Sequence, residues 1–291
     1  APALAAGCTV VFKPASQSPG AAAIFFQIAA DAGLPPGVLN LVTGSASRIT
    51  GQWLADRRIR KITFTGSTEI GKQLARGAAD QMKRVSMELG GHAPFIVFED
   101  ADLDLAVEGA IASKFRNNGQ TCICANRIYV QKSVKEAFVQ KLKARVEALR
   151  IGDGMDEAVD LGPLVDQAAV RKVEEHVRDA VAKGARVVTG GRRLDEPPFA
   201  KGCFYAPTVL DEADETMLIS REETFGPVAP VYAFETEEEV IRRANDTVYG
   251  LAAYFYTNDL SRAARVSEAL EYGMVGVNDP VMTTVQGPFG G

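Results

Sequence analysis

Histidine and cysteine are both scarce in this sequence. Its 291 residues include two histidines, His92 and His176, and four cysteines. Neither histidine stands in a recognisable catalytic setting, which disfavours a hydrolase that works through a cysteine–histidine pair. No zinc or other metal site is predicted, because the cysteines and histidines lack companions at metal-ligand spacing. The cysteines are also too few for a disulfide framework, and they indicate a reducing, cytoplasmic environment.

Long apolar runs and an excess of positive charge are lacking as well. No run approaches the ~20 apolar residues that a membrane-spanning helix needs, and the first residues do not have the pattern of a signal peptide. The net charge of −5 argues against a general nucleic-acid binder, which needs a basic face. Because there is also no initiator methionine, an excerpt from a longer protein is one interpretation of the chain.

Short apolar runs alternate with helical patterns along the first ninety residues. The expected strands lie at 10–12, 38–42, 61–64 and 84–89. The first helix is expected from Pro19 to Ala32, with Ser18 as its N-cap. Strands separated by helices are typical of parallel βαβ units, whose ligands bind at the carboxyl ends of the strands.

A Gly90-Gly91 pair then interrupts the pattern. We predict a hinge there between two domains, 1–90 and 91–291. The second part again alternates apolar runs, such as 251–256, with helical patterns, such as 166–183, so that the whole chain is predicted to be α/β.

The segment 61–73 (KITFTGSTEIGKQ) combines an expected strand, a glycine-bounded turn and a helix. Backbone N–H groups at such a turn can bind phosphate. Gly66, Gly71 and Lys72 nearly complete a P-loop, but Gln73 stands where that motif needs a hydroxyl for magnesium. An ATP-binding protein is therefore disfavoured. A dinucleotide phosphate site and a structural turn that needs small residues remain as alternatives.

Two residues have surroundings that suit chemistry. Cys122 follows a polar loop, and a loop thiol near a helix end or a cationic cofactor can act as a nucleophile. Glu88 ends an apolar strand just before two glycines, where a carboxylate can serve as a general base or form an ion pair with a nearby Lys or Arg. Cys8 and Cys203 have no such surroundings, and we interpret them as small core residues.

Together these segments resemble the aldehyde dehydrogenase superfamily. The stretch 87–91 (MELGG) looks like the family's glutamate signature and 119–122 (GQTC) like its cysteine signature, with Cys122 34 positions after Glu88. Further similar stretches are KPAS at 13–16, FTGS at 64–67, EETFGP at 222–227 and PFGG at 288–291. The resemblance covers the whole chain in order.

The resemblance implies a partial Rossmann-type cofactor domain, of which 1–90 would be the C-terminal part, followed by an α/β catalytic domain at 91–291. It implies that Cys122 forms a thiohemiacetal and then a thioester with the aldehyde, and that Glu88 activates the water that releases the acid. The implied cofactor-binding residues are Lys13 and Ser16 at the adenosine ribose, Gly66 and Ser67 at the pyrophosphate, Leu89, and Glu223 and Phe225 at the nicotinamide end.

Cofactor and substrate preferences follow from three positions in the same resemblance. NAD-preferring relatives often have a glutamate at the position of Ser16, so the serine favours NADP, with NAD as the alternative. Arg116 matches an arginine that succinate-semialdehyde dehydrogenases use for the substrate carboxylate, and a guanidinium suits that contact. Thr283 and Phe289 would line the substrate site with it. A solvent-facing arginine is the structural alternative for Arg116.

Several alternatives stay open. Glutarate semialdehyde fits the same charge logic as succinate semialdehyde, and a broad-specificity enzyme or an inactive fragment would keep the same motifs. Cys124 suggests a reversible disulfide with Cys122, or a spectator thiol. The resemblance also implies that an oxyanion-donating asparagine would lie upstream of Ala1 and that the full-length protein is a homo-oligomer.

Overall fold

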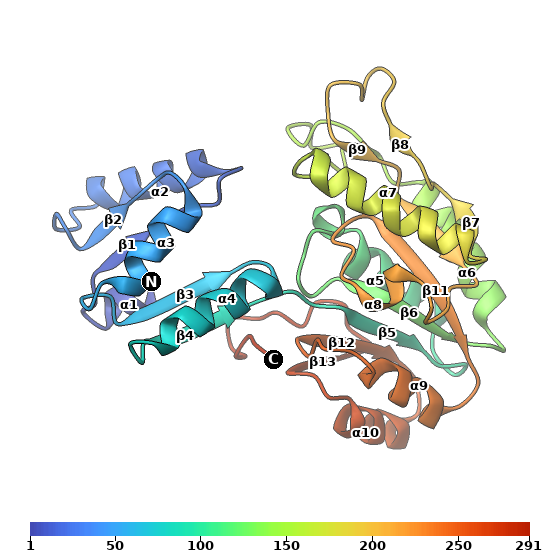
Figure 1. The fold of residues 1–291 in the computed structure, drawn as a ribbon. Helices are drawn as coiled ribbons and strands as arrows, with labels where there is room; N and C mark the ends of the chain where they lie inside the picture. Colours follow the sequence, from blue (N-terminus) through green and yellow to red (C-terminus); the bar gives the residue numbers. More distant parts are fainter. The chain divides into compact units, whose positions relative to one another are not determined.

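The computed structural model describes residues 1–291 (Figure 1). The chain forms two compact units, Ala1–Leu89 and Gly90–Gly291. The division falls one residue before the end of the first predicted domain. No helix is long and apolar enough to cross a membrane.

The first unit contains two separate pairs of parallel strands. β1 (Val10–Phe12) pairs with β2 (Leu39–Leu41), and β3 (Lys61–Thr65) pairs with β4 (Arg84–Glu88). Its helices are α1 (Pro2–Ala5), α2 (Pro19–Asp31), α3 (Ala46–Ala55) and α4 (Thr68–Ala79). Each of β1, β2 and β3 leads into a helix, which is the predicted βαβ arrangement.

The ends of α2 show how local sequence sets a helix. Pro19 occupies the first turn, where its missing N–H is not needed. Ser18 is the N-cap residue, as predicted, but its side chain makes no capping hydrogen bond. After Asp31 the chain turns at Gly33, whose φ of +84° is a conformation that glycine adopts without a steric penalty.

The second unit is built on a seven-stranded sheet in the order β13-β12-β5-β6-β11-β10-β7. Its strands are β5 (Ala93–Val97), β6 (Ala125–Gln131), β7 (Arg186–Thr189), β10 (Thr208–Asp211), β11 (Val228–Phe234), β12 (Ala252–Tyr256) and β13 (Met274–Val277). All neighbours are parallel except β7, which pairs antiparallel with β10. A small antiparallel pair, β8 (Arg193–Leu194) and β9 (Phe204–Tyr205), lies outside this sheet.

Helices cover both faces of this sheet (Figure 1). They are α5 (Leu103–Lys114), α6 (Lys135–Glu147), α7 (Gln167–Ala182), α8 (Leu218–Arg221), α9 (Glu237–Asn245) and α10 (Leu260–Ala269). Residues of α5 and α6 belong to one buried apolar cluster, and residues of α7, α9 and α10 to the other. Along β5 the side chains alternate between the clusters, with Phe95 in the first and Ile96 in the second. Strands such as β5, which is buried on both faces, are therefore apolar along their length, as is typical of parallel sheets.

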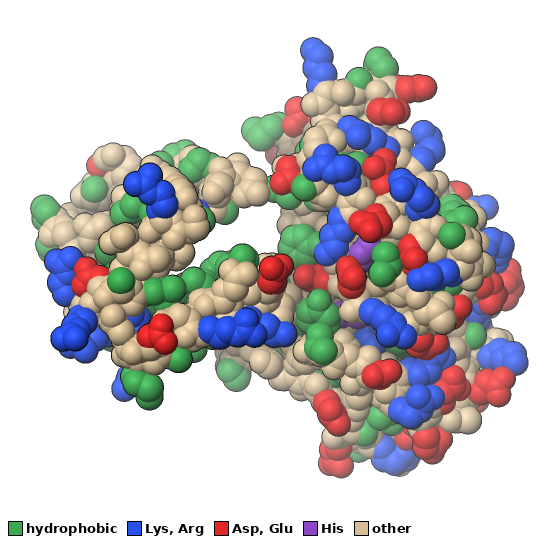
Figure 2. Space-filling model, in the orientation of Figure 1, with side chains coloured by type: hydrophobic (Ala, Val, Ile, Leu, Met, Phe, Trp, Pro, Cys, Tyr) green, Lys and Arg blue, Asp and Glu red, His purple; other side chains and the backbone are tan.

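Charged groups lie mostly outside these clusters. On the face drawn in Figure 2, Lys and Arg side chains are interspersed with Asp and Glu over the second unit. Mixed signs of this kind keep a surface hydrated without creating a strong field of one sign.

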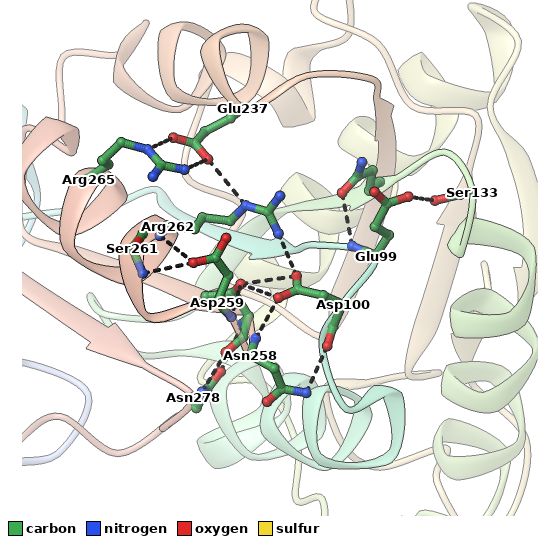
Figure 3. Close-up of polar contacts among 12 residues, drawn as sticks. Glu99, Asp100, Ser133, Glu237, Asn258, Asp259, Ser261, Arg262, Arg265 and Asn278 are labelled. Atoms are coloured by element: carbon green, nitrogen blue, oxygen red, sulfur yellow. Dashed lines mark hydrogen bonds and ion pairs between the residues drawn. The ribbon is translucent and has the colours of Figure 1, made fainter.

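The carboxyl ends of β5 and β12 are tied together by polar contacts around Asp100 (Figure 3). Its carboxylate accepts hydrogen bonds from the Thr257 hydroxyl at 2.7 Å and from Arg262 at 2.6 Å. Arg262 also donates to Glu237 at 3.2 Å. Burial alone would raise the pKa of Asp100, but these hydrogen bonds and the Arg262 charge lower it. The carboxylate thus stays ionised and links α9, α10 and two strand ends.

Candidate active site

Cys122 lies in the loop between α5 and β6, at the amino end of β6. A short turn, η1 (Arg116–Gly119), begins this loop, and its residues Asn117, Asn118 and Gly119 have φ values of 51°, 59° and 75°. Asparagine tolerates this left-handed conformation better than most residues, and glycine adopts it freely. The Asn-Asn-Gly stretch therefore allows the chain to reverse sharply just before the cysteine.

Side-chain hydrogen bonds hold the reversed loop. The amide of Asn118 donates to the Gly162 carbonyl at 2.9 Å, and the Gln120 side chain accepts from the Val165 N–H at 2.9 Å. Asn117 also donates to the Gln120 carbonyl at 3.0 Å. The polar residues that marked this loop in the sequence are thus used to fix its shape.

Backbone from two other loops packs directly against the cysteine loop. A methyl group at Gly91 would lie 1.8 Å from the carbonyl oxygen of Cys122, and one at Gly119 would lie 2.2 Å from the carbonyl oxygen of Gly226. Both distances are far below van der Waals contact, so these approaches require glycine. The amino ends of β5, β6 and β11 therefore converge on Cys122.

Glu223 lies in the third of these loops, just before β11. Its Oε1 atom accepts a hydrogen bond from the Gly91 N–H at 3.0 Å. Burial raises the pKa of Glu223, and the Gly91 hydrogen bond and the charges of Lys172 and Lys114 offset part of that effect. Phe225 follows with a φ of 54° and a partly exposed ring. An aromatic residue in this strained conformation is typical of functional loops.

Buried polar groups support the cysteine loop from the core side. The Lys114 amine is fully buried and donates to Asn126 Oδ1 at 2.8 Å and to Cys124 Sγ at 3.4 Å. The Tyr254 hydroxyl donates to the Ile123 carbonyl at 2.8 Å. The sequence pointed to Cys124 but not to Lys114, Asn126 or Tyr254. A lysine ending an apolar helix and an asparagine beginning an apolar strand were the available signals.

The second cysteine of the loop is a buried thiol. Burial raises the pKa of Cys124, and the nearby Lys114 ammonium offsets part of this effect. No disulfide joins Cys122 to Cys124 in this structure. The proposed redox pairing of these two residues stays a prediction.

Both histidines have structural surroundings. His92 lies in the loop before β5, and its side chain is buried beside the Tyr249 ring. Burial lowers the pKa of His92 well below its usual range, so the ring is neutral. His176 is buried on α7 and contacts the Thr224 hydroxyl at 3.1 Å. Cys8, which was expected in the core, is exposed, and Cys203 is half-buried.

The predicted substrate-binding residues lie in two segments. Arg116 is exposed at the start of η1. Thr283 and Phe289 lie in the C-terminal segment, the first half-buried and the second exposed. This segment returns to the amino ends of β12 and β13, because a methyl group at Gly273 would lie 2.0 Å from the Gly290 carbonyl oxygen. The segment thus reaches the edge of the sheet at which Cys122 lies.

In the first unit, the predicted cofactor residues follow strands at their carboxyl ends. Lys13 and Ser16 come directly after β1, and the Lys13 amine donates to the neighbouring Pro14 carbonyl. Ser67 is the N-cap of α4, and its hydroxyl accepts from the Ile70 N–H at 3.4 Å. Gly66 precedes it.

Glu88 and Leu89 lie beside this turn. The Gly66 N–H donates to the Glu88 carbonyl at 3.0 Å, and Gly71 on α4 packs so closely on Leu89 that a methyl group there would lie 2.3 Å from its Cδ2 atom. A glycine turn at the N-terminus of a twelve-residue helix suits a pyrophosphate. The residues present therefore fit a dinucleotide.

These observations place a loop cysteine, Cys122, at the amino edge of the sheet in one α/β unit, and a glycine turn at a helix N-terminus in the other. The chain belongs to the aldehyde dehydrogenase family, whose sequence model, described as "Aldehyde dehydrogenase family", matches residues 1–291.

Relatives with established names are similar over the whole chain. The chain is 57% identical over 290 residues to a glutarate-semialdehyde dehydrogenase of Pseudomonas aeruginosa, covering 100% of this chain and 59% of that protein. It is 56% identical to an NADP+-dependent succinate-semialdehyde dehydrogenase of Escherichia coli, with the same coverage. The crystal structure of succinate-semialdehyde dehydrogenase from Burkholderia pseudomallei superposes with a TM-score of 0.96 at 50% identity, covering 99% of this chain and 59% of that one. The chain thus spans about 59% of the length of these relatives.

Proposed function

We propose that the protein to which this chain belongs oxidises an aldehyde that carries a free carboxylate, succinate semialdehyde in the first place, to the corresponding acid with NADP+. The proposal rests on one observation: the loops that precede β5, β6 and β11 converge on Cys122. The chain also matches the aldehyde dehydrogenase family over its whole length.

The chemistry begins and ends at two side chains. The Cys122 thiolate adds to the aldehyde carbon and forms a thiohemiacetal, which splits a difficult oxidation into two easier steps. The bound nicotinamide cofactor supplies the acceptor for the hydride. A thioester then remains on Cys122, and Glu88 takes a proton from the water that hydrolyses it.

Each unit contains residues that we propose for cofactor binding. In the first, Lys13 and Ser16 would bind the adenosine ribose and its phosphate, and Gly66, Ser67 and Leu89 would form the pyrophosphate site. In the second, Glu223 would accept from the nicotinamide ribose, and Phe225 would pack at the nicotinamide. The preference for NADP over NAD is supported by the neutral Ser16 beside the Lys13 cation, because no carboxylate there repels a 2′-phosphate.

Arg116 would bind the substrate carboxylate, with Thr283 and Phe289 completing the substrate site. The names of the relatives support an anionic aldehyde, since they include succinate- and glutarate-semialdehyde dehydrogenases and a 3-sulfolactaldehyde dehydrogenase at 54% identity. Glutarate semialdehyde is the second candidate, because two relatives at 57% and 56% identity have that name. One methylene changes binding by only ~1–3 kcal/mol.

The test is the rise in absorbance at ~340 nm of the reduced cofactor when the full-length protein receives succinate or glutarate semialdehyde with NADP+. We expect Cys122→Ala to abolish turnover and the control Cys203→Ala to keep it. We expect Glu88→Gln to keep a first burst of reduced cofactor and to lose steady turnover, because only hydrolysis needs the base. Full activity in Cys122→Ala would overturn the proposal. We further propose that the protein is cytoplasmic, in keeping with the reactive thiol. We also propose that it is a homo-oligomer.

A further inference from the structure

Tyr254 connects the core of the second unit to the cysteine loop. It lies on β12, is 1% exposed, and its hydroxyl donates to the Ile123 carbonyl at 2.8 Å. Ile123 stands between Cys122 and Cys124 in the sequence. A single buried hydroxyl thus contacts the Ile123–Cys124 peptide group, which begins one residue after Cys122.

The ring of Tyr254 cannot easily move away from this contact. It belongs to the first apolar cluster, and its centroid is 6.1 Å from that of Phe95. Close packing of this kind holds side chains in one rotamer. The position of the hydroxyl is therefore set by the sheet, and the loop is fastened to it.

The N–H group of the same Ile123–Cys124 peptide also makes a hydrogen bond. The Cys124 N–H donates to the Thr121 carbonyl at 3.1 Å, which closes a tight turn around Cys122. The Cys124 thiol contacts the Lys114 amine and donates to the Lys114 carbonyl, both at 3.4 Å. If the Tyr254 hydrogen bond were lost, the turn would keep the contacts of Cys124. Only the peptide groups next to Cys122 would then be free to rotate.

Tyr256 offers a matched comparison on the same strand. It lies two residues further along β12, belongs to the same cluster, and packs on Phe95 at 4.9 Å. Its hydroxyl is buried but has no hydrogen-bond partner. The core therefore does not need a tyrosine hydroxyl in order to pack, which separates the function of the Tyr254 hydroxyl from that of its ring.

We propose that Tyr254 is a positioning residue for Cys122, whose hydroxyl holds the Ile123 carbonyl and thereby aims the Cys122 thiol at its electrophile. The effect on turnover rests on the proposed function, whereas the effect on thiol reactivity does not. A displacement of about 1 Å at a reacting group can slow a reaction about 100-fold.

Because Tyr254 stays protonated, the effect of its hydroxyl on Cys122 is expected not to depend on pH. Burial raises the pKa of Tyr254 to about 12. The hydroxyl is thus a donor throughout the range in which enzymes and thiols are assayed. The ratio of wild-type to variant reactivity is expected to be constant with pH.

The experiment compares Tyr254→Phe with Tyr256→Phe in the full-length protein. The rate of alkylation of Cys122 by iodoacetamide is measured by peptide mass spectrometry, and kcat and KM are measured in the absorbance assay. We expect Tyr254→Phe to lower the alkylation rate and kcat about 10- to 100-fold. The KM values for the aldehyde and for the cofactor are expected to change little. We expect Tyr256→Phe to behave as the wild type.

Each outcome decides the proposal. Equal alkylation rates in Tyr254→Phe and the wild type would overturn it, as would equal losses in the two variants, since a general packing defect would then explain both. Hydrogen exchange at the Cys124 amide checks the local mechanism, and it is expected to speed up in Tyr254→Phe alone. If alkylation falls while no aldehyde is oxidised by any form of the protein, the positioning role stands and the proposed function fails.

Discussion

The backbone N–H of Gly91 donates a hydrogen bond to Oε1 of Glu223 at 3.0 Å, although 132 positions separate the two residues. Gly91 precedes β5 and Glu223 precedes β11, and the sheet places β6 between these two strands. The contact therefore passes over the amino end of β6, where Cys122 lies. The Cys122 thiol and the Glu223 carboxyl group are in this way brought to one edge of the sheet by backbone contacts.

Substitution of Gly91 tests this arrangement. A methyl group in Gly91→Ala would meet the Cys122 carbonyl oxygen at 1.8 Å, so the loops must separate. We expect a loss of about 1–3 kcal/mol in the free energy of unfolding and a fall of about 100-fold in Cys122 alkylation. Gly154→Ala is the control, because that site has open space. Wild-type alkylation in Gly91→Ala would contradict the geometry.

The ionisation of Glu223 predicts how stability changes with pH. Burial raises the pKa of Glu223 in the folded state, so the contribution of this carboxyl to stability is present at low pH and is lost as pH rises through the raised pKa. Glu223→Gln cannot ionise. The melting temperature of the variant minus that of the wild type is therefore expected to increase between about pH 4 and pH 8. The KM of the variant for NADP+ is expected to be higher than that of the wild type. The exposed Glu157→Gln serves as the control, and a pH-independent difference would refute the assignment.

Arg116 is expected to affect the binding of aldehydes that carry a carboxylate and not of uncharged aldehydes. Its loss in Arg116→Ala removes a charge-assisted contact, worth about 1.5–3 kcal/mol, so KM for succinate semialdehyde should rise about 10- to 100-fold. KM for propanal should stay within about two-fold. Arg192→Ala, at another exposed arginine, controls for net charge. Equal effects on both aldehydes would exclude a carboxylate-binding role.

Ser16 is expected to control the choice of cofactor. A carboxylate in Ser16→Glu would repel a 2′-phosphate, so kcat/KM with NADP+ should fall about 10-fold or more, whereas kcat/KM with NAD+ is maintained. Ser18→Glu provides a control close by, since the Ser18 side chain makes no capping bond. The assignment fails if both cofactors respond alike to Ser16→Glu.

Peroxide should inactivate the enzyme reversibly if Cys122 and Cys124 form a disulfide. Such a small ring is strained and easily reduced, so dithiothreitol is expected to restore activity in the wild type. Cys124→Ala should lack the reversible component, whereas Cys203→Ala should keep it. Reversible loss of the same size in Cys124→Ala would rule out the pair.

Local sequence predicted most of the elements. Helix α7 runs from 167 to 182, against the expected 166–183, and β12 covers 252–256 of the expected 251–256. Apolar periodicity carries this information because helices and strands repeat at different periods. The candidate nucleophile Cys122 could also be proposed from local sequence, since an Asn-Gly-rich loop before a cysteine is a local feature.

Burial was predicted less well. His92 is in the core although it follows two glycines, and Cys8 is exposed although it is small and apolar. The buried Lys114 is the last residue of α5, where a lysine normally faces water. Whether a side chain is covered depends on elements distant in sequence, which no local pattern contains.

Residue types and their spacing along the chain were enough to predict the α/β class, the order of the motifs and Cys122 as the candidate nucleophile. The assembled sheet was needed to show that the second unit gathers its loops at the amino ends of β5, β6 and β11, whereas the first unit has its glycine turn at the carboxyl end of β3. The order of strands in the sheet brings Gly91, Cys122 and Glu223 together. Backbone contacts of this kind form only when the sheet is assembled.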